Sequence, residues 1–236
     1  MHLSPAVLLS IWFDALRAGS ERVEGLVERV RGEAPNTIVV SGSGTVQSLG
    51  EVVADWAASG ARMRLALPVP GDPVGLGGPA GFNQAALDAG EAVVVAGAGL
   101  VPGEDARTLV WHSHPAEPAP YVDARESARG LRMALLETTR TLVGLDVASW
   151  QPEIPDLLMN LRHRPRPMLP QHWDGARAET LDRALLCREV VALALEDQGG
   201  AVSAYEMGVR RDALRDLDRA ARRALVAVCS DSLVSP

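Results

Sequence analysis

His112 and His114 are the residues whose type and spacing come closest to metal chemistry in this chain. They stand in the run Trp111-His-Ser-His-Pro115, at the end of a segment that predicts a β-strand. Successive side chains of a strand point to opposite faces, so both imidazoles are expected on one face. A catalytic zinc takes three protein ligands and keeps one position for water. The two histidines therefore predict half of a zinc site.

Carboxylates nearby in the sequence are the candidates for a third ligand. They are Glu104, Asp105, Glu117 and Asp123. Asp123 stands three residues before Glu126, a spacing that predicts a capping box at the start of a helix and thus a structural use for the aspartate. One hypothesis is a zinc site built on the two histidines and Asp123, and the alternative is a pair of polar residues at a strand end.

The segment His112–Pro115 resembles the metal motif of the JAB/MPN (JAMM) metallopeptidases. In that family His-x-His-Pro follows a strand, a serine and an aspartate come after it, and an upstream glutamate acts as general base. Here the serine position is Val122, the aspartate position is Arg125, and Glu51 is an upstream glutamate. The resemblance implies a metal-dependent hydrolase, and it covers the first four residues of the motif.

A glycine-containing segment, Ser41-Gly-Ser-Gly-Thr45, lies between a predicted strand and a helix predicted from Gln47 to Ala58. Such a loop can direct backbone N–H groups onto a phosphate at a helix N-terminus. Gln47 stands where the dinucleotide-binding fingerprint has its third small residue. The alternative is a tight strand-to-helix turn in which Ser43 or Thr45 caps the helix. The candidate ligand-binding residues of this loop are Gly42, Ser43 and Gly44.

A second loop, residues 68–81, is dense in glycine and proline and carries a single charge, Asp72. Loops of this length are often functional, so Asp72 is a further candidate for ligand binding; the alternative is an ordered connector. Ligands bind beyond the carboxyl ends of parallel strands, which would unite both loops with the histidines. The short link 97–106, however, favours a hairpin. A hairpin would place His112 and His114 at the opposite edge from the glycine loops.

The pattern of helices and strands predicts an α/β fold with a helical C-terminal portion. Two helices precede strands expected at residues 37–41, 62–68, 91–96 and 107–112, which indicates a small mixed, mainly parallel four-stranded sheet with flanking helices. Further helices are expected at 123–145, 154–161, 176–197 and 203–228, the last opened by a capping box of Ser203 and Glu206. Residues 1–120 and 121–236 form these two portions, either as separate domains or as one continuous domain.

The charged residues exclude several classes of function. All 23 basic residues are arginine, so the chain has no lysine for a Schiff base or a phosphate loop. The net charge of −7 argues against a general nucleic-acid binder. Arg211, Arg215, Arg219 and Arg222 trace one helical face, but the interleaved aspartates 212, 216 and 218 indicate solvated ion pairs. Two isolated cysteines and the absence of a signal-like or membrane-spanning segment predict a cytoplasmic protein.

The whole chain is similar to uncharacterised proteins of high-GC actinobacteria, a resemblance that implies no assigned activity. Because the residues show no complete catalytic set, the favoured hypothesis is a non-catalytic binding or protein-interaction module. Its apolar helices would serve a homodimer or a protein partner. The alternative is a JAB/MPN-like metal-dependent hydrolase that uses His112 and His114, with zinc as the cofactor.

Overall fold

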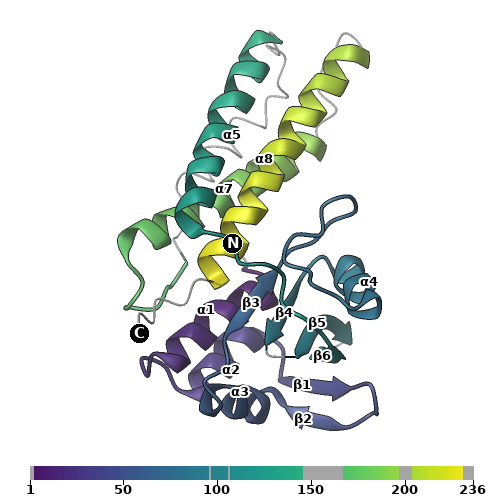
Figure 1. Cartoon of the computed structure of the whole chain (residues 1–236), viewed down its shortest axis with the longest axis vertical. Helices are drawn as coiled ribbons and strands as arrows, with labels where there is room; N and C mark the ends of the chain where they lie inside the picture. The colour runs from purple at the N-terminus through teal and green to yellow at the C-terminus, as the bar shows by residue number, and fades with distance from the viewer. Residues whose placement is uncertain (1–2, 96, 106, 146–166, 197–203, 231–236) are drawn as a thin grey trace. The chain divides into compact units, whose positions relative to one another are not determined.

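The computed structural model describes residues 3–95, 97–105, 107–145, 167–196 and 204–230, and these form two compact units (Figure 1). Residues up to Val122, together with 168–174 and 229–230, make the α/β unit. The described residues from Asp123 to Val228 that remain make the helical unit. The predicted helix at 154–161 and Ser203 of the predicted capping box lie outside the described residues.

A mixed six-stranded sheet organises the α/β unit, with the strand order β2-β1-β6-β5-β4-β3. Its strands are β1 (Asn36–Ser41), β2 (Val46–Ser48), β3 (Met63–Ala66), β4 (Ala92–Val95), β5 (Ala98–Asp105) and β6 (Thr108–Pro115). Only β1 and β6 pair in parallel, and the other four pairings are antiparallel. The α/β class is confirmed, but the prediction of four strands in a mainly parallel sheet is wrong.

One of the two unpredicted strands, β5, contains residues that disfavour a strand. β5 carries Gly99, Pro102 and Gly103, which is why it reads as a connector. Pro102 is tolerated because the later part of β5 pairs with β6 alone and leaves its other edge open. Gly99 is required by packing, since a Cβ there would overlap the ring of Phe82. The other unpredicted strand, β2, contains residues that the sequence pattern assigns to the following helix, but this helix begins only at Leu49.

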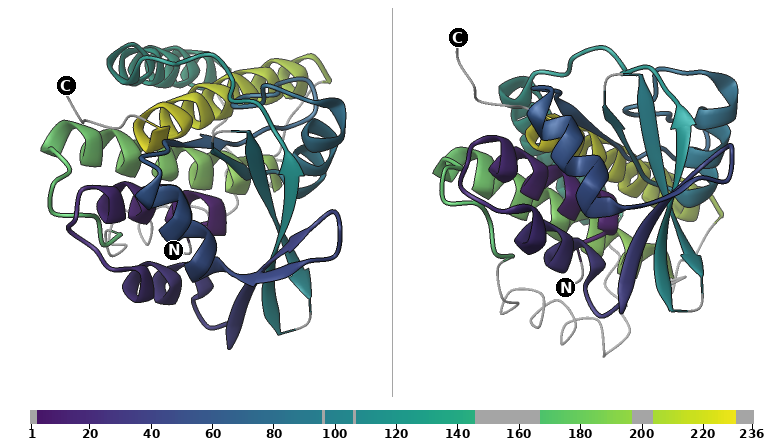
Figure 2. Two further views of the ribbon diagram at one scale, coloured as in Figure 1. Left: turned by 60° about the horizontal axis from the view of Figure 1, so that its bottom comes forward. Right: turned by 90° about the horizontal axis from the view of Figure 1, so that it is seen from below.

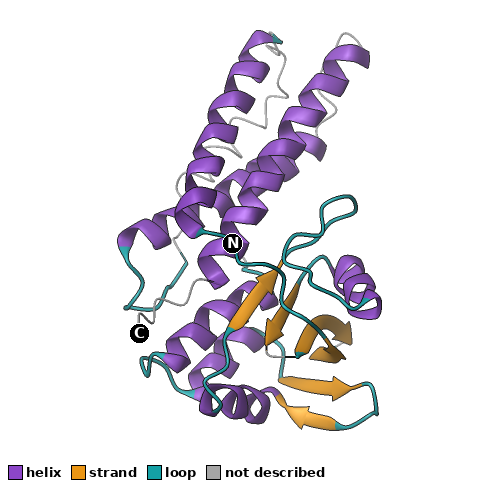
Figure 3. Cartoon of the chain, viewed as in Figure 1, coloured by secondary structure: helices purple, strands orange, loops and turns teal. Residues whose placement is uncertain are grey.

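Four helices cover the sheet (Figures 2 and 3). Those on one side are α1 (Pro5–Arg17), α2 (Val23–Arg31) and α3 (Leu49–Ala58), whereas α4 (Ala80–Ala89) packs on β5 and β6. Phe82 and Ala86 of α4 lie in a fully buried apolar cluster with Val94 and Val101 of the sheet. All four residues of β4 are buried, so the middle of the sheet is covered on both faces.

The helical unit contains α5 (Ala124–Gly144), α7 (Gly175–Glu196) and most of α8 (Ala204–Ser230), which confirms the predicted helical C-terminal portion. The Thr138 hydroxyl donates to the Ala213 carbonyl at 3.1 Å and so joins α5 to α8. Arg177 of α7 donates to the Val228 carbonyl at 2.8 Å. No helix in the described ranges is both long and apolar enough to cross a membrane.

Two of the predicted arginines of α8, Arg219 and Arg222, pair with aspartates of the same helix, and one of these pairs is not solvated. Arg219 bonds Asp216 at 2.8 Å on the surface. Arg222 bonds Asp218 at 2.7 Å with its side chain only 3% exposed. Arg188 of α7 reaches the same Asp218 at 3.3 Å. This carboxylate therefore links α7 to α8, and the prediction of a wholly solvated face is wrong at Arg222.

Candidate functional site

The histidine pair lies at the carboxyl end of β6, beside the strand that precedes the glycine loop. His112 is in register with Val40, and Ser113 with Ser41, on the parallel pair β1 and β6. The histidines and the loop 42–45 therefore share one edge of the sheet, and the prediction that a hairpin separates them is wrong. The hairpin exists, but it joins β5 to β6. A further reversal between β4 and β5 restores the direction.

The two imidazoles occupy different environments on one face of β6. His114 is half-buried, with its ring centroid 6.4 Å from that of Phe82. His112 is exposed and leans over Gly103, where a Cβ would lie 3.1 Å from its Nε2 atom. Burial, and to a lesser degree the charge of His112, hold the pKa of His114 below its ordinary value. The lowered pKa favours the neutral imidazole of His114, which keeps a lone pair for a ligand or a hydrogen bond.

Among the side chains that the structure describes, none joins the two histidines as a third metal ligand. Asp123, the proposed ligand, belongs to the helical unit and accepts the N–H of Glu126 at 2.7 Å as the N-cap of α5. Among the described side chains, no group of three or more histidines, cysteines and carboxylates comes together. Two imidazoles do not make the three-ligand set of a catalytic zinc. The described donors thus do not fit the zinc centre that the JAB/MPN resemblance implies.

Glu51, the upstream glutamate of that resemblance, has a structural position. It forms a reciprocal capping box with Ser48 at the start of α3, in which each side chain accepts the other residue's backbone N–H. The Ser48 N–H group lowers the pKa of Glu51. A carboxylate stabilised in its ionised form is a weak general base, so the geometry gives Glu51 no catalytic use.

The segment 41–45 is a hairpin turn between two strands, so the expected strand-to-helix phosphate loop is wrong. The Ser41 N–H donates to the Thr45 carbonyl at 2.9 Å, and the Gly44 N–H donates to the Ser41 carbonyl at 2.9 Å. The Ser41 and Ser43 hydroxyls lie 2.8 Å apart. The next helix begins after β2 and is capped by Ser48, not by Ser43 or Thr45. The three residues of β2 separate this turn from the start of α3, so Gly42, Ser43 and Gly44 do not form the first turn of a helix where a phosphate could bind.

Asp72 is placed away from the histidines. It lies in a tight turn in which the backbones of Val69 and Asp72 bond each other at 2.9 and 3.1 Å, and the residue is 7% exposed. This turn follows β3, which is three strand positions from β6, or about 14 Å at the usual spacing. β3 also runs opposite to β6, so its carboxyl end faces the other edge. The union of Asp72 with the glycine loop and the histidines, which was the alternative to the favoured hairpin, is therefore not found.

A serine–histidine–aspartate chain that the sequence did not indicate joins the segment 168–174 to α1. The Asp14 Oδ2 atom lies 3.0 Å from His172 Nε2, and His172 Nδ1 lies 3.3 Å from the Ser20 hydroxyl. The same Asp14 oxygen accepts the indole N–H of Trp173 at 3.2 Å. The Ser20 hydroxyl also donates to the Ala15 carbonyl at 3.1 Å.

Ser20, His172 and Asp14 stand in the order of an acyl-transfer triad, but their surroundings indicate a structural link between the segment 168–174 and α1. Ser20 is exposed at a turn, and its own N–H is bonded to the Ala15 carbonyl, so it offers no oxyanion donor. Asp14 receives donors from two neighbouring side chains, which fixes the segment 168–174 on α1. About 150 residues separate Ser20 from His172, so no spacing rule could have connected them.

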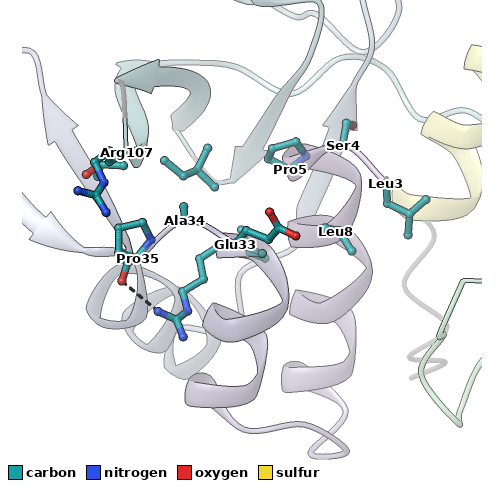
Figure 4. A pocket seen from close by; sticks show the side chains of 13 residues that line it. Leu3, Ser4, Pro5, Leu8, Glu33, Ala34, Pro35 and Arg107 are labelled. Carbon is teal, nitrogen blue, oxygen red and sulfur yellow. Dashed lines mark hydrogen bonds between the residues drawn. The ribbon is translucent and has the colours of Figure 1, made fainter. Parts of the chain in front are cut away.

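A pocket of about 680 Å³ opens at the other edge of the sheet, where β1 and β6 begin (Figure 4). Its walls come from the start of α1, the end of α2 with the residues that follow, and the β5–β6 turn. Most of the lining is apolar, and three charged residues surround it. The principal residues are Leu3, Pro5, Leu8, Ala34, Pro35 and Leu109, with Arg31, Glu33 and Arg107. No motif marks it, because three separate segments build it.

The side of α5 that faces away from its neighbours is a second unpredicted feature. Leu131 and Thr138 are buried, whereas Met133, Leu136 and Val143 are 59%, 53% and 75% exposed. Helical spacing places arginines on the same side as these apolar side chains. We call this surface the outer face of α5; it comprises Arg125, Arg129, Arg132, Met133, Leu136, Arg140 and Val143.

Two family models match the chain. The model for the Rv1486c-like protein N-terminal domain matches residues 6–124, and that for the C-terminal domain matches residues 125–226. The chain belongs to the Rv1486c-like protein family. A Mycobacterium avium relative called uncharacterized protein MAV321 is 29% identical over 220 residues, covering 73% of this chain and 69% of the relative. No solved structure matches the chain.

Membership of the Rv1486c-like family confirms the predicted resemblance to uncharacterised actinobacterial proteins. Both matching family models describe Rv1486c-like domains, and neither describes a JAB/MPN metallopeptidase. In the Rv1486c-like chain, the N-terminal family domain contains the histidine pair and most of the residues that line the pocket. The C-terminal family domain contains the outer face of α5. The three candidate surfaces are thus distributed over both domains.

Proposed function

We propose that this Rv1486c-like protein is a non-catalytic interaction module that binds an acidic, amphipathic segment of a partner protein on the outer face of α5. The observation that carries the proposal is the combination of exposed arginines with large exposed apolar side chains on one side of this helix. The described residues offer no complete catalytic set that competes with it.

The exposed apolar side chains of the outer face provide the driving force for binding. Met133, Leu136 and Val143 recur at helical spacing, so their side chains lie on one stripe of the surface. Each is more than half exposed although the opposite side of α5 is packed on its neighbours. Exposed apolar residues that gather in this way mark interaction sites, whereas single ones are ordinary. Covering each side chain contributes about 1.5–3 kcal/mol at full burial.

The arginines of the outer face determine the charge that a partner should carry. Arg125, Arg129 and Arg132 form no ion pair with any side chain of the described ranges, and all three are exposed. Arg140 lies 3.5 Å from Glu137, but both side chains are over 70% exposed, so this bond contributes little. Four guanidinium groups beside an apolar stripe complement a segment that carries carboxylates beside its own apolar side chains.

Other occupants are less compatible with the charges. The chain carries a net charge of −7, which opposes binding to an anionic bilayer or to nucleic acid. No aromatic side chain lies on the face to stack a base. Two copies that met through this face would place their arginines together. A separate acidic protein segment therefore fits best.

The test uses the full-length protein and a fluorescein-labelled peptide of leucine and glutamate in amphipathic helical order. Fluorescence anisotropy should detect saturable binding, and Met133→Asp with Leu136→Asp should weaken it at least about tenfold. The control is Val46→Asp, because Val46 is also 59% exposed but lies in the α/β unit. Equal binding by the wild type and the paired variant would overturn the proposal, as would light scattering that shows a dimer broken by the same substitutions.

A further inference from the structure

We propose that the pocket between α1, α2 and the β5–β6 turn binds a small organic cation, a primary amine on an apolar chain, with Glu33 as the group that holds the ammonium. This site is independent of the outer face of α5, and it lies in the other unit of the chain. The proposal rests on the shape of the pocket, its apolar walls and the direction of its charged side chains.

The size and the walls of the pocket suit a small molecule. Its volume of about 680 Å³ lies within the range of ligand pockets, which is about 300–1,000 Å³. Val30 and Leu109 are buried beneath it, and Leu3, Pro5 and Leu8 are half-buried along it. An aliphatic chain placed there would cover apolar surface that water now reaches, which is the driving force for binding.

Glu33 is the charged side chain directed into this space. Figure 4 shows its carboxylate extending from the end of α2 towards Pro5 and Leu8. Within the described part of the chain, Glu33 makes neither an ion pair nor a side-chain hydrogen bond. Glu33 is exposed at the rim of the pocket, where its carboxylate can pair with an ammonium group whose aliphatic chain lies on the apolar walls.

The other charged groups near the pocket have different directions or existing partners. The Arg31 guanidinium donates to the Pro35 carbonyl at 3.0 Å. Arg107 lies beyond Pro35, on the side away from Leu8 (Figure 4). The N-terminus of α1, which would otherwise attract an anion, already has the Glu91 carboxylate 3.2 Å from the Ala6 N–H. The inward charge of the pocket is therefore negative, and a cation fits it.

The experiment compares three probes with the same aliphatic chain: n-hexylammonium, hexanoate and hexan-1-ol. Isothermal titration of the full-length protein should show saturable binding of the ammonium probe, and the acid and the alcohol should bind at least about tenfold more weakly. Glu33→Gln should reduce ammonium affinity to that of the alcohol. The control is Glu28→Gln, an exposed position of α2 outside the pocket, which should leave the affinity for the ammonium probe unchanged.

Two further variants separate the pocket from non-specific effects. Leu8→Gln removes an apolar wall and should weaken the ammonium probe while the circular dichroism spectrum stays that of the wild type. Binding that is equal for the three probes, or that survives Glu33→Gln, would overturn the proposal. Tighter binding of hexanoate than of hexylammonium would also overturn it, because that result would assign the pocket to Arg31 and Arg107.

Discussion

The ring of His114 packs against the ring of Phe82, with 6.4 Å between the centroids and 51° between the planes. The contact contributes to the burial of His114, and burial is the main reason that the pKa of this histidine is lowered. The unfolded chain, in which the imidazole is solvated, therefore binds a proton more readily than the folded protein does.

This difference predicts that stability falls with acidification. Above the ordinary histidine pKa of about 6.5 the stability is full, and it is lost as the pH decreases through the lower folded pKa. Urea unfolding between about pH 7.5 and about pH 5.5 should show a smaller loss for His114→Gln than for the wild type. His112→Gln should keep most of the loss, because burial and not the neighbouring charge dominates. An unchanged pH dependence in His114→Gln would refute this account.

Gly99 should resist substitution because the strand passes directly under α4. A Cβ at this position would overlap Phe82 and lie 2.8 Å from the Ala116 side chain. Overpacking of this kind costs about 1–3 kcal/mol, so Gly99→Ala should lower the free energy of unfolding by that amount. Gly42→Ala, which has open space around its Cβ position, should change it by no more than about 0.5 kcal/mol. Equal effects at the two positions would show that β5 does not lie under Phe82.

The two sides of α5 should differ in what a truncation costs. Leu131 is 1% exposed, and Leu131→Ala should destabilise the protein by about 2–5 kcal/mol. Leu136→Ala on the outer face should cost no more than about 0.5 kcal/mol. Chemical denaturation measures both. If Leu136→Ala proves as costly as Leu131→Ala, the outer face is part of the core and cannot be a docking surface.

Asp14 should hold the segment 168–174 in place. In Asp14→Ala, His172 and Trp173 lose an acceptor that lies 3.0 and 3.2 Å from their ring nitrogens. Amide hydrogen exchange in residues 168–174 should accelerate in this variant, while exchange in β4 stays slow. Ser20→Ala serves as the comparison, since it removes only the longer contact of 3.3 Å. Unchanged exchange in Asp14→Ala would contradict the proposed link.

The sequence predicted the helices of both portions and four of the six strands, because periodicity and capping residues act locally. The start of α5 follows from Asp123. The side chain of Asp123 caps this helix, as the spacing between Asp123 and Glu126 predicts. Strand β5 was missed because its glycines Gly99 and Gly103 make room for Phe82 and His112, which no local pattern connects to them. Its omission then removed one reversal of direction and misplaced the histidines.

The candidate sites were harder to predict than the elements. Spacing correctly placed His112 and His114 on one strand end, but a third ligand depends on tertiary structure, which no local rule supplies. The pocket at Glu33 and the Asp14–His172 contact each unite segments that are separate in the chain. The outer face of α5 could have been found from its heptad-like spacing, but the sequence does not show which side of a helix is left uncovered.

A charge exchange tests the central claim, that the outer face of α5 binds an acidic segment, most directly. Arg129→Glu with Arg132→Glu should abolish binding of the leucine–glutamate peptide and create binding of a matched leucine–lysine peptide, while the wild type shows the reverse preference. Restored affinity within about tenfold of the original pair is the predicted result. Loss of the first peptide without gain of the second, or equal binding of both peptides by the wild type, would contradict the claim.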